Sequence, residues 1–257
     1  MGNVSYAVGD RAAIVTIERP ERRNAVDWPT ATELYDAFKR FDADESADVA
    51  ILTGRGGAFC AGADLKAVAE GERGERVKMD GDFGPMGATR LMLSKPVIAA
   101  IEGHAVAGGL ELACWADLRV AAEDAVLGVF CRRFGVPLID LGTVRLPRLI
   151  GASRAMDLIL TGRPVSAQEA FDIGLVNRLA PPGGALAAAK TLAAQLSAFP
   201  QTCLRNDRRS ALEQWSLDWD AATLREAELG RATLRTGESV AGAARFKSGQ
   251  GRHGDFG

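Results

Sequence analysis

Hydrophobic and polar positions follow two different periods along this chain. Short β-branched, apolar runs predict buried strands, and apolar residues spaced by three and four predict amphipathic helices. Strands are expected at 4–8, 11–18, 49–53, 97–101, 118–120 and 125–127, and helices at 29–41, 63–69, up to residue 91, 110–115, 152–160, 167–173, 186–199, 216–229 and 240–246. Strand-plus-helix units therefore recur through the first two-thirds, and helices form the last third. This order predicts an α/β fold with a helical C-terminal portion.

The change in pattern also predicts the domain organisation. We expect an α/β core over residues 1–190 and a helical region over 191–257. Within the core, residues 70–82 are charged, rich in glycine and without apolar periodicity, which is typical of a mobile surface segment.

Composition narrows the classes of partner. The 257 residues are 47% hydrophobic and 25% charged, and 31 basic against 33 acidic residues leave a net charge of −2. There is no basic field for nucleic acid, and no apolar run reaches the roughly 18 residues that a membrane span needs. The four cysteines lie far apart without metal-ligand spacing. We therefore expect a cytoplasmic, reduced protein without a metal site, a membrane anchor or a nucleic-acid partner.

Two glycine-rich stretches, 57–66 and 103–111, each end a predicted strand and open a predicted helix. Backbone N–H groups at a helix N-terminus lack intrahelical partners and attract negative charge. Neither stretch has the lysine of a P-loop, the dinucleotide-binding glycine spacing or a Gly-x-Ser-x-Gly elbow. Two such turns are suited instead to holding a carbonyl oxygen that becomes an oxyanion.

Glu111 follows the second of these turns. It stands in the first turn of the predicted helix among apolar neighbours. Such a carboxylate beside an anion-holding turn is a candidate acid or base. The alternative is an ordinary glutamate that favours a helix N-terminus from its solvated face.

Ordered motifs along nearly the whole chain resemble the crotonase family, the enoyl-CoA hydratase/isomerase superfamily. They are Arg23-Asn24-Ala25-Val26, Ala58-Phe59-Cys60-Ala61-Gly62-Ala63-Asp64-Leu65-Lys66, Lys95-Pro96-Val97-Ile98-Ala99-Ala100-Ile101-Glu102-Gly103, Ala107-Gly108-Gly109-Leu110-Glu111-Leu112-Ala113, Arg145-Leu146-Pro147-Arg148-Leu149-Ile150-Gly151, Leu160-Thr161-Gly162 and Ala170-Phe171-Asp172-Ile173-Gly174-Leu175-Val176.

The resemblance implies a crotonase-like spiral of ββα units, followed by helices that build a homotrimer or a dimer of trimers. It implies an acyl-CoA thioester substrate and no cofactor beyond the coenzyme A of that substrate. By position, the thioester oxygen would bind the backbone N–H groups of Ala63 and Gly108. The regions that match the substrate- and CoA-binding parts of the family contain Arg22, Arg23, Ala61, Asp64 and Lys66, of which the three basic residues are equally well explained as surface charges.

The chain departs from the hydratase pattern at one position. Glu111 matches one of the two catalytic glutamates of the family's hydratases, but the other falls on Cys131. A thiol with an ordinary pKa near 8.5 is a poor substitute for a carboxyl group, so we interpret Cys131 as a packing residue.

Asp140 is the second candidate acid or base. It lies in a loop that faces the substrate in family members, where some relatives place a working aspartate, although theirs aligns one residue earlier, at Ile139. Asp140 could equally cap the helix that begins at Gly142.

The sequence leaves more than one function open. It favours hydratase-type chemistry by Glu111 and Asp140 over double-bond isomerisation by Glu111 alone. Two further classes stay open, a CoA-thioester-binding protein without turnover and an RNA-binding family member, and the net charge disfavours the RNA-binding class. The sequence does not specify the acyl chain.

Overall fold

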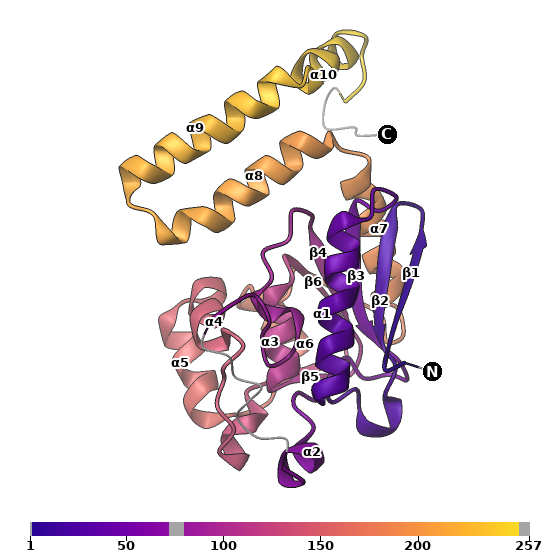
Figure 1. Cartoon of the computed structure of the whole chain (residues 1–257), viewed down its shortest axis with the longest axis vertical. Helices are drawn as coiled ribbons and strands as arrows, with labels where there is room; N and C mark the ends of the chain where they lie inside the picture. The colour runs from indigo at the N-terminus through magenta and orange to yellow at the C-terminus, as the bar shows by residue number, and fades with distance from the viewer. Residues whose placement is uncertain (1, 72–79, 252–257) are drawn as a thin grey trace. The chain divides into compact units, whose positions relative to one another are not determined.

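The computed structural model describes residues 2–71 and 80–251. The chain divides into two compact units, Met1–Leu196 and Ser197–Gly257. The first unit is an α/β structure and the second consists of helices (Figure 1). The predicted α/β class is therefore confirmed. The predicted boundary at residue 190 falls inside the helix α7 (Ala185–Ser197).

A six-stranded sheet forms the centre of the first unit. Its strand order is β1-β2-β3-β4-β6-β9. Only the β1–β2 pair is antiparallel, and each of the following pairs is parallel. The strands are β1 (Val4–Gly9), β2 (Ala12–Ile17), β3 (Val49–Gly54), β4 (Val97–Ile101), β6 (Leu118–Ala122) and β9 (Arg178–Ala180).

The central strands are apolar because both faces of the sheet are covered. In β3, Ala50 and Leu52 contribute to the larger core, whereas Val49 and Ile51 contribute to a smaller core on the other face. Helices α1 (Trp28–Ala43) and α3 (Gly108–Trp115) pack into the larger core, and α7 packs into the smaller one (Figure 1). Continuous apolar runs of β-branched residues thus correctly predicted buried strands.

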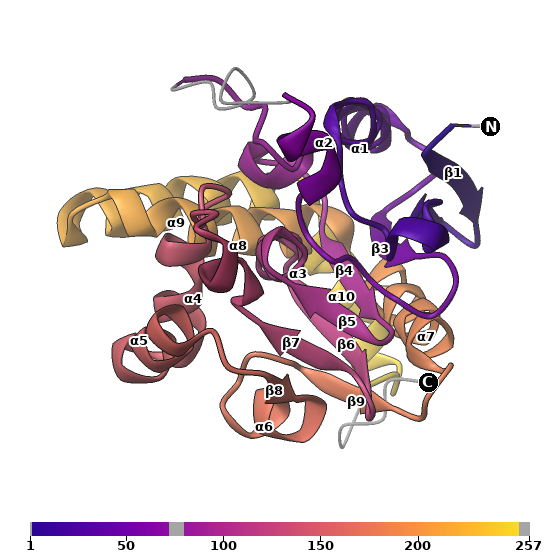
Figure 2. The same ribbon diagram turned by 90° about the horizontal axis from the view of Figure 1, so that it is seen from below.

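A second, three-stranded sheet lies beside the first and has the order β5-β7-β8 (Figure 2). Its strands are β5 (His104–Val106), β7 (Val126–Gly128) and β8 (Val165–Ser166). Strand β5 leads directly into α3, so a strand of each sheet is followed by one helix in a β4-β5-α3 unit. The other helices of the first compact unit are α2 (Leu65–Ala69), α4 (Gly142–Ile150), α5 (Ala152–Thr161) and α6 (Ala167–Asp172). Its 3₁₀ turns include η1 (Pro20–Arg22), η3 (Ala88–Arg90) and η4 (Phe130–Phe134).

The predicted helix up to residue 91 is wrong, because only the 3₁₀ turn η3 forms there. Gly87 has a positive φ of 80° and pairs with Gly84 in an isolated bridge, which turns the chain back on itself. Asp140 from a distant loop then accepts a hydrogen bond from the backbone N–H of Met86. A side chain 54 residues away thus satisfies a donor that a helix would have satisfied locally.

The second unit contains α8 (Gln201–Glu213), η5 (Gln214–Ser216), α9 (Trp219–Arg235) and α10 (Glu238–Lys247). Helices α8 and α9 lie side by side as a hairpin (Figure 1), joined by a hydrogen bond from Asn206 Nδ2 to Thr233 Oγ1 of 2.9 Å. The sequence did not predict α8, whose residues are mostly polar. The predicted helix 216–229 begins three residues later, because Asp218 caps α9 through Ala221 N.

Two further predictions concern membranes and mobility. Among the described residues, no helix has the length and apolar character required to cross a membrane. Most of the predicted mobile segment 70–82 lies outside the described residues, since the description stops at 71 and resumes at 80.

Candidate active site

A cavity of about 570 Å³ opens in the first unit. Its lining is mainly apolar, and three of its side chains are titratable, namely Glu111, Cys131 and Asp140. The other lining residues are Ala61, Ala63, Leu65, Val68, Pro85, Met86, Ala107, Gly108, Phe130, Phe134, Gly135, Val136, Pro137 and Ile139. Apolar walls with a few convergent polar groups are typical of a small-molecule site.

The turn before α3 places a residue with an unsatisfied backbone N–H, Gly108, in the lining of this cavity. Ala107 adopts the strained combination φ 55°, ψ −125° immediately before Gly108, the first residue of the helix. No acceptor among the described residues takes up the N–H of Gly108. The next residue, Gly109, has no room for a side chain, because a Cβ there would lie 2.1 Å from the carbonyl oxygen of Cys60. Close backbone packing therefore holds this donor.

The turn before α2 provides the second donor. Ala63 lies between two backbone hydrogen bonds to Val26, one from Val26 N to Gly62 O of 2.8 Å and one from Asp64 N to Val26 O of 2.9 Å. Its own N–H has no acceptor among the residues that the structure describes. The two turns touch, since a Cβ on Gly62 would lie 2.9 Å from Gly108 N. Two unsatisfied donors thus lie on adjoining turns of one cavity.

Glu111 is 3% exposed, so the interpretation as a solvated helix glutamate is wrong. Its Oε1 accepts hydrogen bonds from Asp140 N at 2.9 Å and Gly142 N at 2.8 Å. Leu141, between these donors, has the left-handed conformation φ 67°, ψ 19°, which directs both N–H groups to one side. No donor among the described residues reaches Oε2, so this oxygen is the one available for a proton.

Burial and, to a smaller extent, the charge of the neighbouring Asp140 raise the pKa of Glu111 to about 8. The two backbone donors and Arg145 oppose this shift without cancelling it. A carboxyl group that exchanges its proton near neutral pH is suited to acid–base catalysis.

Asp140 does not cap α4. The N-cap position belongs to Leu141 and no side chain caps it. Asp140 is 2% exposed, and its Oδ1 accepts hydrogen bonds from Met86 N at 2.9 Å and from Thr89 Oγ1. Burial raises the pKa of Asp140, although both hydrogen bonds favour its ionised form. The structure thus brings Glu111 and Asp140 to one cavity, with Asp140 also tying two segments together.

Comparison with known proteins places the chain among acyl-CoA enzymes. The family model described as Enoyl-CoA hydratase/isomerase matches residues 9–248. The chain belongs to the enoyl-CoA hydratase/isomerase family. It is 36% identical to enoyl-CoA hydratase EchA19 of Mycobacterium tuberculosis over 237 residues, covering 91% of this chain and 89% of that protein. It is 41% identical to carnitinyl-CoA dehydratase of Salmonella typhi over 187 residues, covering 71% and 69%.

Solved structures of this family share the fold. Enoyl-CoA hydratase EchA1 of Mycobacterium marinum superposes with a TM-score of 0.90 at 38% identity, covering 96% of both chains. An enoyl-CoA hydratase of Mycobacterium tuberculosis superposes with a TM-score of 0.89, also at 38% identity and 96% coverage of both chains. The expected crotonase fold is therefore confirmed.

Only some of the residues that the sequence predicted for the site line the cavity. Ala61 does, but Arg22, Arg23 and Lys66 are exposed residues outside the lining. Asp64 is buried and is not a lining residue; it caps α2 and binds Arg19. Cys131 is 6% exposed and lines the cavity, and burial raises the pKa of its thiol. The roles assigned to these residues in substrate binding stay predictions.

The sequence did not indicate the residues that position the candidate site, namely Thr89, Leu141 and Arg19. Thr89 and Leu141 carry no local signal, since a threonine and a leucine are ordinary in any segment. Arg19 has no local signal beyond its position before Pro20. Among the described residues, no three metal-ligating side chains come together.

Proposed function

We propose that this protein is an enoyl-CoA hydratase-type lyase in which Glu111 and Asp140 work as an acid–base pair. The observation that carries the proposal is the presence of both buried carboxyl groups in the same cavity as the free N–H groups of Ala63 and Gly108. The names of the relatives, a hydratase and a dehydratase, support the same class of reaction.

The proposed oxyanion hole consists of the two free N–H groups. When water adds at C3 of a 2-enoyl thioester, negative charge develops on the thioester oxygen. Donors held in place before the reaction stabilise that charge, and each is worth roughly 10²–10³ in rate. Ala63 and Gly108 belong to turns that are fixed by backbone contacts, so they need little rearrangement to bind the oxygen.

The proposed acid–base pair shares one proton. In hydration, Asp140 removes a proton from the attacking water while the oxygen adds to C3, and Glu111 delivers its proton to C2. The raised pKa of Glu111, about 8, keeps that proton on the enzyme at pH 7. Burial raises the pKa of Asp140, and the hydrogen bonds from Thr89 Oγ1 and Met86 N oppose this rise by favouring its ionised form. Dehydration uses the same pair with the proton on Asp140 at the start.

A second function, double-bond isomerisation by Glu111 alone, is favoured by a different observation. Oδ1 of Asp140 already accepts two hydrogen bonds that hold the 86–89 segment, which is a structural task. Cys131 stands where hydratases of the family carry their second glutamate. In this second function, ionised Glu111 removes a proton from C2 and returns it at C4.

Recognition of the coenzyme and assembly complete the proposal. Arg22, Arg23 and Lys66 are exposed basic residues on the segments next to Ala61 and Ala63, and we propose that they bind the nucleotide part of coenzyme A.

We also propose that the protein assembles as a homotrimer or a dimer of trimers. Trp215, Trp219 and Leu224 of the second unit are 53%, 84% and 63% exposed, whereas Leu229 of α9 is buried.

Product analysis tests the proposed reaction. The protein is incubated separately with trans-2-enoyl-CoA and trans-3-enoyl-CoA, and the products are separated by chromatography. A hydratase forms 3-hydroxyacyl-CoA from the first substrate, whereas an isomerase forms 2-enoyl-CoA from the second and never adds water. If acyl-CoA binds but neither product forms, the protein is a binding protein without turnover. If RNA binds tightly and acyl-CoA does not bind, the whole proposal is wrong.

A further inference from the structure

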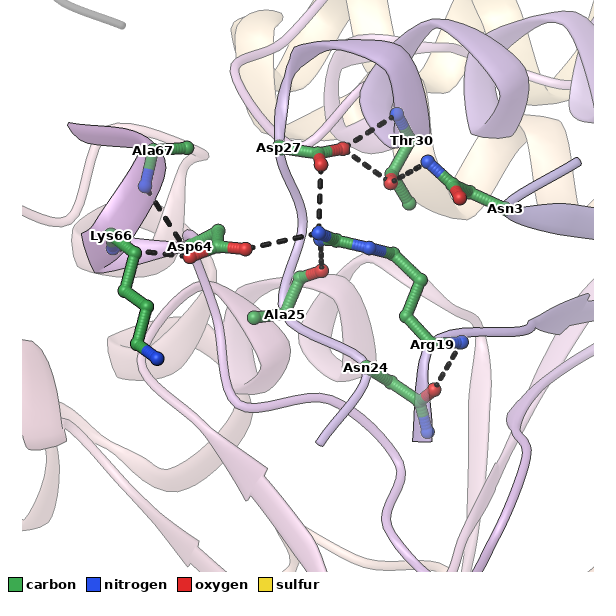
Figure 3. A network of polar contacts seen from close by, with 9 residues as sticks. All are labelled: Asn3, Arg19, Asn24, Ala25, Asp27, Thr30, Asp64, Lys66 and Ala67. Carbon is green, nitrogen blue, oxygen red and sulfur yellow. Dashed lines mark hydrogen bonds and ion pairs between the residues drawn. The ribbon is translucent and has the colours of Figure 1, made fainter. Parts of the chain in front are cut away.

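Arg19 joins two carboxylates outside the cavity lining. It follows β2, and its Nη2 lies 2.8 Å from Asp27 Oδ2 and 3.0 Å from Asp64 Oδ2 (Figure 3). Its Nη1 donates to the carbonyl oxygen of Ala25. The three charged side chains are only 8–16% exposed. A planar guanidinium with several fixed donors is suited to joining two acceptors in this way.

Each of these carboxylates also caps a helix through its other oxygen. Asp27 Oδ1 accepts from Thr30 N at 3.0 Å and caps α1. Asp64 Oδ1 accepts from Lys66 N at 3.1 Å and Ala67 N at 3.4 Å and caps α2 (Figure 3). Arg19 therefore connects the N-termini of two helices.

The two helices differ in how firmly packing holds them. In α1, the side chains of Leu34, Phe38 and Phe41 are fully buried in the core. Helix α2 has five residues and none of them is buried. Polar contacts, rather than packing, must therefore set the position of α2, and Arg19 transmits the position of α1 to it.

The position of α2 matters because Ala63 immediately precedes its cap. Two backbone hydrogen bonds to Val26 also hold this segment, and one of them starts at Asp64 N. A movement of Asp64 therefore strains that bond and shifts the adjoining Ala63, which lies in the cavity lining. Leu65 and Val68 of the same helix line the cavity. An oxyanion donor must lie about 2.7–3.1 Å from the oxygen, and an error of about 1 Å can cost roughly a hundredfold in rate.

Charge balance adds to this requirement. Burial tends to raise the pKa of Asp64, but the N–H of Ala67, the Arg19 side chain and the N–H of Lys66 outweigh it, so this pKa lies below its ordinary value. Asp27 and Asp64 both bind one guanidinium nitrogen, and without Arg19 two carboxylates would face each other at close range. Their repulsion would separate α2 from α1.

We propose that Arg19 is a positioning residue of the oxyanion hole, which acts through Asp64 to hold the N–H of Ala63 against the thioester oxygen. This inference rests on the proposed function, in which Ala63 and Gly108 bind that oxygen. Arg19 itself is not among the residues that line the cavity.

The test measures how strongly the site polarises a thioester carbonyl. Butanoyl-CoA with a ¹³C-labelled carbonyl is a saturated probe that cannot be hydrated, and isotope-edited infrared spectra report its C=O stretch when bound. In the parent protein, two donors lower the frequency of this band relative to free probe. We expect Arg19→Gln to reduce the lowering by about half, to decrease kcat about 10–100-fold, and to change KM less than about threefold. Arg19→Lys keeps the positive charge but lacks the several fixed donors of the guanidinium. Its band shift and its kcat should lie between those of the parent and those of Arg19→Gln.

Arg55→Gln is the matched control. Arg55 pairs with a single carboxylate, that of Glu18, at 2.7 Å, and its side chain is 64% exposed and lies outside the cavity lining. This variant should retain the parent band and the parent kcat. If Arg19→Gln does not fold, Asp64→Asn carries the same measurement, because its Oδ1 still caps α2 while the charge that binds Arg19 is lost.

The outcomes separate this inference from the proposed function. A parent band that does not move on binding shows that the site lacks an oxyanion hole and overturns both. A parent band that moves, together with an equal shift in Arg19→Gln, overturns the positioning role alone, even if kcat falls. A reduced shift in Arg19→Gln with an unchanged band in Arg55→Gln supports it.

Discussion

The two buried carboxyl groups of the cavity are held in opposite ways. Glu111 and Asp140 are 3% and 2% exposed, and one oxygen of each accepts two hydrogen bonds. Both donors to Glu111 are backbone N–H groups of one short loop. The donors to Asp140 are a backbone N–H and a hydroxyl of a different segment, which Asp140 joins to its own loop. The backbone of one loop therefore positions the Glu111 side chain, whereas the Asp140 side chain positions the 86–89 segment.

This difference teaches how to separate chemistry from structure at each position. A substitution at Glu111 that keeps an acceptor oxygen leaves the loop in place, because the backbone provides the donors. At Asp140, loss of the acceptor would also release Met86 and Thr89. Only an amide at either position, which retains one oxygen acceptor, removes the acid–base function alone.

The largest effect is expected for Glu111→Gln. The amide oxygen still accepts from Asp140 N and Gly142 N, but the side chain no longer carries an exchangeable proton. We expect hydration or isomerisation to fall about 10³-fold or more, near the upper range for loss of a general acid–base group. Steady-state kinetics measure the loss, and unchanged binding of butanoyl-CoA is the control. A variant that retains a tenth of the parent rate would exclude Glu111 as the proton carrier.

Asp140→Asn should decrease hydration at least about a hundredfold. Its Oδ1 can still accept from Met86 N and Thr89 Oγ1, so the 86–89 segment stays in place. Thr89→Val is the matched control, because it removes one of these hydrogen bonds and leaves the carboxyl group intact. If Thr89→Val loses as much activity as Asp140→Asn, or if Asp140→Asn hydrates as fast as the parent, Asp140 has only its structural task.

Gly142→Ala perturbs how Glu111 is held without changing the carboxyl group. A Cβ at Gly142 would lie 2.7 Å from Glu111 Oε1 and 2.8 Å from its Cγ. The Glu111 side chain must move, and we expect kcat to fall roughly 10–100-fold while the protein stays folded. Gly135→Ala is the control, because Gly135 also lines the cavity but a Cβ there would not meet Glu111. Gly135 has a φ of 69°, so this substitution should lower stability rather than kcat. An unchanged kcat in Gly142→Ala would mean that the position of Oε1 is unimportant.

The pH dependence of kcat/KM distinguishes the two proposed reactions. A hydratase needs one proton on the pair, so its kcat/KM falls about tenfold per pH unit above the Glu111 pKa of about 8. An isomerase needs ionised Glu111, so its kcat/KM rises with pH and levels off above about 8. A profile that is flat between pH 6 and 9 contradicts both assignments of Glu111.

The smallest effect is on stability. Burial raises the pKa of Glu111 in the folded protein from its ordinary 4.5 to about 8. Between pH 4.5 and 8, Glu111 ionises in the unfolded chain but stays protonated in the folded protein, which lowers the free energy of the unfolded state relative to the folded one. The contribution of Glu111 to stability is therefore full below about pH 4.5 and is lost as the pH rises to about 8. We expect Glu111→Gln to raise Tm at pH 8 by several degrees, because each unit by which the pKa rises corresponds to about 1.4 kcal/mol and each kcal/mol shifts Tm of a domain of this size by roughly 2–4 °C. Calorimetry at pH 4.5, where the two proteins should agree, is the control.

Local patterns in the sequence were sufficient to predict the local features of this protein. β-branched apolar runs predicted the buried strands β3 and β4, because a residue in a sheet that is covered on both faces must be apolar at every position. The glycine pair at 108–109 and the first-turn position of Glu111 followed from the same reading, since a tight turn into a helix requires glycine and leaves N–H groups free. Motifs in a fixed order were sufficient to identify the family.

Which polar residues work together depends on long-range contacts in the folded protein. Glu111 meets Gly142 N across 31 residues, Asp140 meets Met86 N across 54, and Arg19 meets Asp64 across 45. None of these contacts has a local signal, because a buried polar group takes whichever partner the fold brings to it. For this reason the sequence left Glu111 as either solvated or buried and Asp140 as either a cap or an acid. It also left Arg19 without a role, since the need for a positioning residue arises only when α2 is seen to have no buried side chain.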